Sequence, residues 1–136
     1  MPTAYEADVI AWSVEQAALL RSGKLSAIDI EHIADEIEDV GKAEQRELAR
    51  RMTILLAQLL RLAHGQPNWE ATVEAQRGSI ERKIRRTPSL KSCLADSDWW
   101  ADAWGDAIAL AAQETGFYLS GVPKECPWDY SQLMAR

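Results

Sequence analysis

The sequence predicts an all-α fold, a single-domain bundle of four to five helices with an irregular C-terminal tail docked against it. Apolar residues recur at intervals of three and four along most of the chain, and no segment alternates as a strand would. The chain has 136 residues, of which 47% are hydrophobic and 26% charged. These values suit one globular domain over residues 1–136, large enough to fold without a metal or a disulfide.

The first helix is expected to begin near Thr3. Thr3 and Glu6 have the spacing of a capping box, in which each side chain accepts a free backbone N–H of the first turn. The apolar stripe of this helix includes Trp12. Gly23 should end it, because glycine adopts the left-handed conformation that follows a last turn.

The second segment carries the longest apolar stripe. Ser26 and Asp29 have the spacing of another capping box, and the stripe runs from Ile30 through Gly41 to Leu62. An unbroken helix from residue 27 to residue 64 would be about 57 Å long. That length exceeds the size of a compact domain of this many residues, so we expect a kink or a break near Gly41.

Two more long helices and the tail complete the predicted fold. Asn68 is expected to cap a helix that ends before Pro88, because a residue that precedes proline is pushed out of helical geometry. Ser89 is expected to cap the last long helix, and Gly116 to end it. Residues 117–136 combine glycine, proline and aromatic residues, which suit an irregular segment packed on the bundle.

The charge and the apolar pattern exclude several classes of function. A net charge of −6 argues against general nucleic-acid binding and against attachment to anionic lipid. The start of the chain has no signal-peptide pattern, and no apolar stretch is long enough to span a bilayer. We therefore expect a cytoplasmic protein in which Cys93 and Cys126 are free thiols. No cofactor motif occurs, so no cofactor is expected.

Short motifs occur in order along nearly the whole chain. They are Tyr5–Asp8, Ala11–Trp12, Asp29–Glu31, Ile33–Glu38, Gly41–Lys42, Leu55–Arg61, Gln76–Arg77, Pro88–Leu90, Glu114–Gly116, Cys126–Trp128 and Gln132–Leu133. In this combination the chain resembles the bacterial family Domain of unknown function 29. The resemblance implies an all-helical protein without an assigned activity. Members often carry histidine where this chain has Gln58, so a site built on that histidine would be absent or altered here.

The acidic stretch of residues 29–39 is a candidate metal site. Asp29, His32 and Glu36 share one helix face, and carboxylates with a histidine at such spacing can bind a divalent ion. Helical di-metal sites, however, need such motifs on two pairs of helices, and nothing equivalent surrounds His64. The alternative is a solvated face whose acids are favoured by the helix dipole.

A basic patch is expected between residues 77 and 91, with Arg82, Lys83, Arg85 and Arg86 at its centre. These side chains could dock RNA, phosphate or an acidic partner. The alternative is a solvated face in which cations complement a helix C-terminus, or a face turned toward the acidic stretch.

The aromatic residues are candidates for partner binding. Trp104 is in phase with the apolar stripe of its helix, whereas Trp99 is farther from it, because adjacent side chains point about 100° apart. Trp99 is expected to be covered by the tail or by a second subunit. Together with Trp100, and with Trp128 and Tyr130 of the tail, it forms the candidate partner-binding set.

No set of residues favours an enzyme. A nucleophilic Cys126 would need a nearby base, and neither histidine can be placed beside it from the sequence. The sequence therefore favours a non-enzymatic helical protein-interaction module, with another protein or a second copy as partner. A metal-dependent activity at Asp29, His32 and Glu36 is the alternative.

Overall fold

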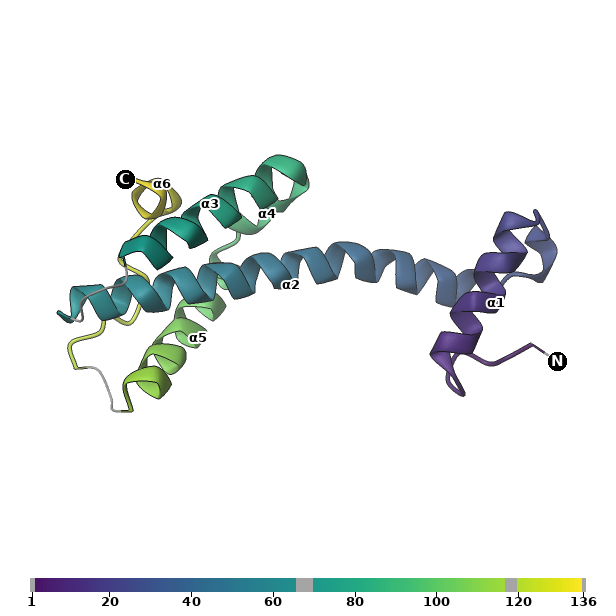
Figure 1. Ribbon diagram of the computed structural model, residues 1–136, viewed down its shortest axis with the longest axis horizontal. Helices are drawn as coiled ribbons and strands as arrows, with labels where there is room; N and C mark the ends of the chain where they lie inside the picture. Colours follow the sequence, from purple (N-terminus) through teal and green to yellow (C-terminus); the bar gives the residue numbers. More distant parts are fainter. Residues whose placement is uncertain (1, 66–69, 117–119, 136) are drawn as a thin grey trace. The chain divides into compact units, whose positions relative to one another are not determined.

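A computed structural model of the chain describes residues 2–65, 70–116 and 120–135. These residues contain helices and no strand, which confirms the all-α prediction (Figure 1). The α-helices of the described residues are α1 (Val9–Arg21), α2 (Ile30–Ala63), α3 (Glu70–Arg86), α4 (Lys91–Leu94), α5 (Ser97–Thr115) and α6 (Tyr130–Met134), with short 3₁₀ helices η1 (Leu25–Ala27) and η2 (Pro88–Leu90). The expected number of helices, four to five, is lower than the number described. The difference comes from α4 and α6, which span only four and five residues.

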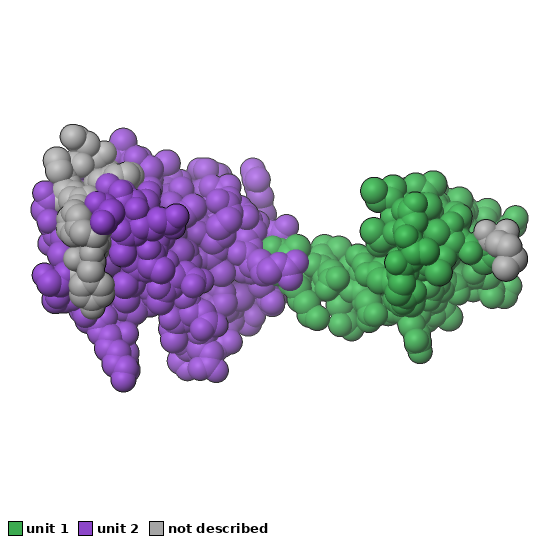
Figure 2. All heavy atoms as spheres, turned by 90° about the horizontal axis from the view of Figure 1, so that it is seen from below, with its two compact units in different colours: residues 1–43 green, residues 44–136 purple. Residues whose placement is uncertain are grey.

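The contacts divide the chain into two compact units, residues 1–43 and residues 44–136, here called the N-terminal and the C-terminal unit (Figure 2). Helix α2 belongs to both and continues without interruption, so the expected break near Gly41 is wrong, and the expected kink there stays a prediction. That expectation assumed that both halves of the helix lie in one compact unit. The prediction of one domain over residues 1–136 stays a prediction.

In the N-terminal unit, α1 begins at Val9 because Asp8 caps it. Oδ1 of Asp8 accepts the N–H of Ala11 at 3.1 Å, so the expected cap at Thr3 is wrong. Thr3 instead donates its N–H and its hydroxyl to the carboxylate of Glu15, at 2.8 and 2.7 Å. Gly23 follows the last turn with a φ of 74°, as predicted.

Asp29 begins α2 and also holds α1 against it. Its Oδ1 accepts the N–H of His32 at 3.3 Å, and residues 25–27 form η1, so the expected capping box at Ser26 is wrong. Its Oδ2 accepts Nε1–H of Trp12 at 3.0 Å, and its own N–H donates to Oε1 of Gln16 at 2.7 Å. Trp12 and Gln16 are the buried residues of α1, so this contact fixes the helix pair.

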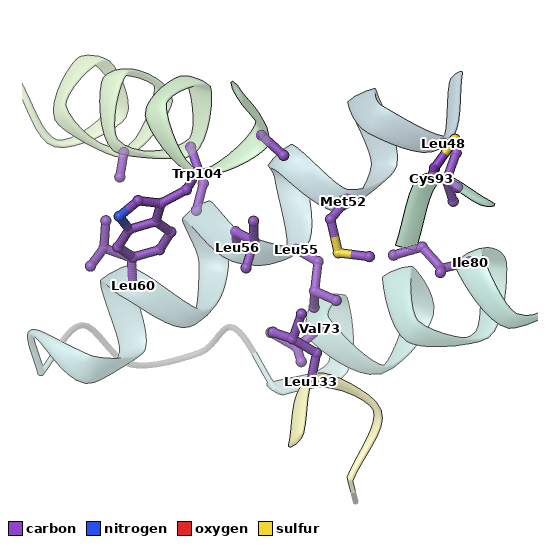
Figure 3. Packing of buried hydrophobic residues seen from close by; sticks show 14 of the residues in the cluster. Leu48, Met52, Leu55, Leu56, Leu60, Val73, Ile80, Cys93, Trp104 and Leu133 are labelled. Carbon is purple, nitrogen blue, oxygen red and sulfur yellow. The ribbon is translucent and has the colours of Figure 1, made fainter. Parts of the chain in front are cut away.

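The C-terminal unit has one apolar core, formed by the second half of α2 with α3, α4, α5 and α6 (Figure 3). Its labelled members are Leu48, Met52, Leu55, Leu56, Leu60, Val73, Ile80, Cys93, Trp104 and Leu133. Leu133 of α6 is only 1% exposed, and its carbonyl accepts Nε–H of Arg77 at 2.6 Å. The described part of the tail is therefore docked on the core, as expected.

The last long helix starts later than the sequence indicates. Residues 88–90 form η2, and Asp96 caps α5 by accepting two N–H groups of its first turn at 2.9 and 3.4 Å, so the expected cap at Ser89 is wrong. Gly116 ends α5 with a φ of 77°, as predicted. The expected cap at Asn68 and residues 117–119 of the tail lie outside the described residues.

Candidate functional site

Four aromatic side chains line a cleft of about 640 Å³ in the C-terminal unit, here called the aromatic cleft. Trp100 and Trp104 come from α5, and Trp128 and Tyr130 from the tail. The rings of Trp104 and Trp128 meet edge to face, with centroids 5.9 Å apart and an interplanar angle of 84°. Two walls of the cleft therefore stand nearly at a right angle.

Hydrogen bonds hold two of these indoles in place. Nε1–H of Trp100 donates to the carbonyl of Leu94 at 2.8 Å, and Nε1–H of Trp104 donates to the carbonyl of Pro123 at 3.0 Å. A buried indole N–H needs such a partner, and its ring is then fixed in orientation. The half-buried Trp100 consequently offers a ligand its ring surface rather than a hydrogen-bond donor, whereas Trp104 is only 2% exposed and lies almost wholly within the core.

The cleft brings together three of the four predicted partner-binding residues, namely Trp100, Trp128 and Tyr130. Trp99 does not line it. Its ring meets that of Trp100 edge-on at 5.1 Å and packs against the core. Trp104, which the periodicity assigns to the core, is buried and also forms a wall of the cleft.

Charged residues that the sequence analysis did not single out stand at the cleft, namely Asp98, Lys124, Glu125 and Asp129. Asp129 is already engaged, because its Oδ1 accepts the N–H of Gln132 at 2.8 Å at the start of α6. Asp98 and Glu125 form no ion pair with any residue that the structure describes.

The sequence of α5 contains a pattern that is consistent with the aromatic cleft. Ser97, Ala101 and Gly105 follow one another at intervals of four, so they share one face of the helix, and all three line the cleft. Small side chains on a face that also carries Trp104 leave room beside the indole. The pattern was visible in the sequence, but nothing in it indicated that the tail would close the opposite side.

Cys126 also lines the aromatic cleft, but its environment opposes nucleophilic chemistry. Its Sγ–H donates to the carbonyl of Trp128 at 3.4 Å, and burial raises the pKa of the thiol. The reactive form of cysteine is the thiolate, which this environment disfavours. Cys93 is a second free thiol, and burial raises its pKa as well.

The structure does not support the metal hypothesis for Asp29, His32 and Glu36. Nδ1 of His32 pairs with Asp29 at 2.7 Å and Nε2 with Glu6 at 3.1 Å, so the two carboxylates occupy opposite edges of one ring. Glu36 instead accepts the hydroxyl of Tyr5, which raises the pKa of that tyrosine to about 12. Within residues 2–65, 70–116 and 120–135, no three His, Cys, Asp or Glu side chains are placed to hold an ion.

The predicted basic patch is partly neutralised by α2. Nζ of Lys83 pairs with Oε2 of Glu44 at 2.7 Å. Arg82, Lys83 and Arg86 line a shallow polar hollow of about 360 Å³, and Arg85 is exposed outside its lining. Lys83 thus faces a carboxylate just beyond the acidic stretch of residues 29–39.

Gln58 is buried in the core, and His64 connects the end of α2 to the tail. Gln58 is 6% exposed within the core, and its Oε1 has no hydrogen-bond partner among the described residues. Nδ1 of His64 lies 2.9 Å from the carbonyl of Leu60, and Nε2 lies 2.9 Å from that of Ser120. Only the imidazolium donates to both, and the Ser120 carbonyl, followed by that of Leu60, raises the pKa of His64.

The exposed large apolar side chains are confined to the N-terminal unit. They are Val9, Ile10, Val14, Leu20, Leu25, Ile30, Ile37 and Val40, and the described part of the C-terminal unit adds none. Ile30, Ile37 and Val40 of α2, here called the open stripe, are 68%, 66% and 67% exposed. Ile30 was expected to begin a buried stripe, and for Ile30 and Ile37 that expectation is wrong.

Comparison with known proteins gives a family without an assigned role. The family model described as Domain of unknown function DUF29 matches residues 4–136. Neither a curated protein nor a solved structure matches the chain. Among the described helices, none combines the length and the apolar character that a membrane span requires.

Proposed function

The chain belongs to the DUF29 family, and because that membership carries no assigned activity, we propose a function from the surface of the molecule. The protein is a helical protein-interaction module that docks a partner helix on its N-terminal unit. The partner helix carries an apolar stripe flanked by lysine or arginine.

The observation that carries this proposal is the confinement of every exposed large apolar residue of the described chain to residues 9–40. Single exposed apolar residues are ordinary on protein surfaces, but Ile30, Ile37 and Val40 lie together on one face of α2, and such a group marks a surface that another molecule covers. A helix that is apolar on all sides is normally buried. On α1, Trp12 is buried against α2, while Ile10 and Val14 remain exposed.

The open stripe has the character of a core face. Ile30 and Ile37 lie 7 residues apart, and Leu48 and Leu55 continue the same helical phase farther along α2. Leu48 and Leu55 are fully buried by the helices of the C-terminal unit, whereas Ile30 and Ile37 are not covered. An uncovered face with this periodicity fits an amphipathic helix whose apolar anchors recur at the same spacing.

The negative charge of the N-terminal unit favours a positively charged partner. Residues 1–43 contain nine Asp and Glu against three Lys and Arg, a net charge of −6, whereas residues 44–136 contain twelve of each. Glu31 and Glu38 follow Ile30 and Ile37 directly, so they lie about 100° round the helix beside the open stripe. Two such faces would repel each other, which favours a basic partner over a second copy.

A designed peptide tests the proposal. The probe is a helix of about five turns with a leucine stripe and lysine elsewhere, and its twin carries glutamate in place of lysine. We expect the lysine peptide to bind, the glutamate twin to fail, and added salt to weaken binding, all measured by fluorescence anisotropy. The double variant Ile30→Ser, Ile37→Ser should bind at least about tenfold more weakly, because two apolar anchors are lost.

The control is Ala43→Ser, which introduces the same polar side chain at an exposed position on another side of α2 without removing an apolar anchor. Equal binding by the double variant and the control would refute the proposal. Sedimentation equilibrium tests the competing occupant. A dimer that the double variant dissociates and the control keeps would assign the open stripe to a second copy instead.

A further inference from the structure

We infer that the aromatic cleft of the C-terminal unit binds a small organic cation with an apolar body, such as an alkylated or quaternary ammonium ion. This site is separate from the surface of the N-terminal unit on which the proposed function rests.

The size and the lining of the cleft suit a small molecule. Its volume of about 640 Å³ lies within the range of roughly 300–1,000 Å³ that is usual for ligand pockets. The walls are the rings of Trp100, Trp104, Trp128 and Tyr130, together with Ile108. These walls favour a ligand that buries carbon against the rings.

The ring geometry favours a positive charge. Trp104 and Trp128 meet edge to face, and Trp104 is only 2% exposed, so the ring surface open to the cleft belongs chiefly to the half-buried Trp100, Trp128 and Tyr130. The face of an indole is electron-rich, and it attracts a cation that lies within about 6 Å of the ring centroid. Because Trp100 and Trp104 have already given their N–H groups to carbonyls, they have no donor left for an anion.

The charged residues at the cleft also favour a positively charged ligand. Three carboxylates and one ammonium group stand around it, which gives a net charge of −2. Asp129 is engaged at the start of α6, but Asp98 and Glu125 are exposed and form no ion pair within the described chain. A ligand cation would therefore meet rings on its apolar side and two available carboxylates at the rim.

The cleft is a binding site rather than a reaction centre. Cys126 carries the most reactive potential nucleophile of its lining, and burial raises the pKa of this thiol, which disfavours the thiolate. Its Sγ–H is also committed to the carbonyl of Trp128. The proposal therefore involves no covalent step.

Isothermal titration calorimetry of the full chain with three probes tests the inference. They are benzyltrimethylammonium, the neutral 2,2-dimethyl-1-phenylpropan-1-ol, in which carbon replaces nitrogen and a hydroxyl is added for solubility, and the anion phenylacetate. We expect the cation to bind at least about tenfold more tightly than the other two. No binding of the cation at millimolar concentration would overturn the inference, and so would equal binding of the neutral probe or tighter binding of the anion.

Two variants locate the site. The double variant Asp98→Asn, Glu125→Gln changes exposed side chains, so it should keep the fold and weaken cation binding about tenfold, with no effect on the neutral probe. Trp128→Leu removes one wall and should weaken the cation similarly, with its melting curve as a check on folding. Trp12→Leu is the control, since Trp12 lies in the N-terminal unit and not in the lining. Unchanged cation affinity in the carboxylate variant would overturn the inference whatever Trp128→Leu does.

Discussion

Two alanine substitutions on one stripe of α2 should have very different costs. Leu48 and Ile37 lie 11 residues apart, about three helical turns, and both belong to the same apolar stripe. Leu48 is 0% exposed in the core of the C-terminal unit, whereas Ile37 is 66% exposed in the N-terminal unit. The periodicity treats the two positions alike, and only burial distinguishes them.

The magnitudes follow from that difference. Leu48→Ala removes buried methyl groups and leaves a cavity, which costs about 3 kcal/mol of unfolding free energy. Ile37→Ala removes a side chain that is mostly in water, so it should change stability by less than about 0.5 kcal/mol. Alanine also forms helix better than isoleucine by a few tenths of a kcal/mol, which offsets part of any loss.

Urea unfolding followed by tryptophan fluorescence measures both effects. Five of the six tryptophans lie in residues 44–136, so the signal reports chiefly on the C-terminal unit, and circular dichroism follows the whole chain. For a unit of this size, a loss of about 3 kcal/mol should lower the midpoint by about 2 M. Equal costs for the two variants would refute the reasoning. A cost above about 1.5 kcal/mol for Ile37→Ala would mean that its side chain is covered in solution.

Further predictions concern two glycines, a histidine and the tail. Gly41→Ala should stabilise α2 by about 0.5–1 kcal/mol, because the new Cβ meets nothing within 4 Å. Gly116→Ala should destabilise α5 by about 1 kcal/mol, because the φ of this residue is 77°. Thermal melts of the two variants compare these effects. The carboxylate of Asp29 raises the pKa of His32, so this pair stabilises the N-terminal unit fully below the ordinary histidine pKa of 6.5. That contribution should be lost as the pH rises through the raised value, and a melting temperature that falls with pH in the wild type but not in His32→Gln checks the sign. Leu133→Ala should cost about 3 kcal/mol and speed limited proteolysis of the tail, because this side chain anchors α6 in the core.

Periodicity predicted the helical class and the positions where glycine or proline ends a helix, but it did not predict which polar residue begins one. Thr3 and Ser26 each have an acidic residue three positions later, yet Asp8 and Asp29 are the caps. The choice depends on distant contacts, such as that of Thr3 with Glu15, which no local spacing reveals.

The extent of burial was the least predictable property of the fold. An apolar stripe shows that a face suits burial, but it does not show whether the same chain covers it. Ile30 was therefore expected to be buried, but the buried residues of α2 begin only at Leu48. The break expected at Gly41 failed for the same reason, since it assumed that one compact unit surrounds the whole helix.

The aromatic cleft was predictable in part. Trp100, Trp128 and Tyr130 stood out because large aromatics off a core stripe need a cover, and the structure brings them together. The carboxylates of Asp98 and Glu125 did not stand out, because acidic residues are common on helix surfaces and in loops. Their relevance comes from the fold of the tail, which brings Glu125 to the lining that Asp98 shares.

The two thiols offer a way to time the detachment of the tail. Cys126 is half-buried at the cleft and Cys93 is buried in the core, so an alkylating reagent reaches the first before the second. Since thiolate is the species that reacts, the raised pKa of Cys126 makes labelling slow while the tail is docked. The rate at which a single label appears in a mass spectrum therefore reports how often this segment leaves the core, without any substitution in the chain.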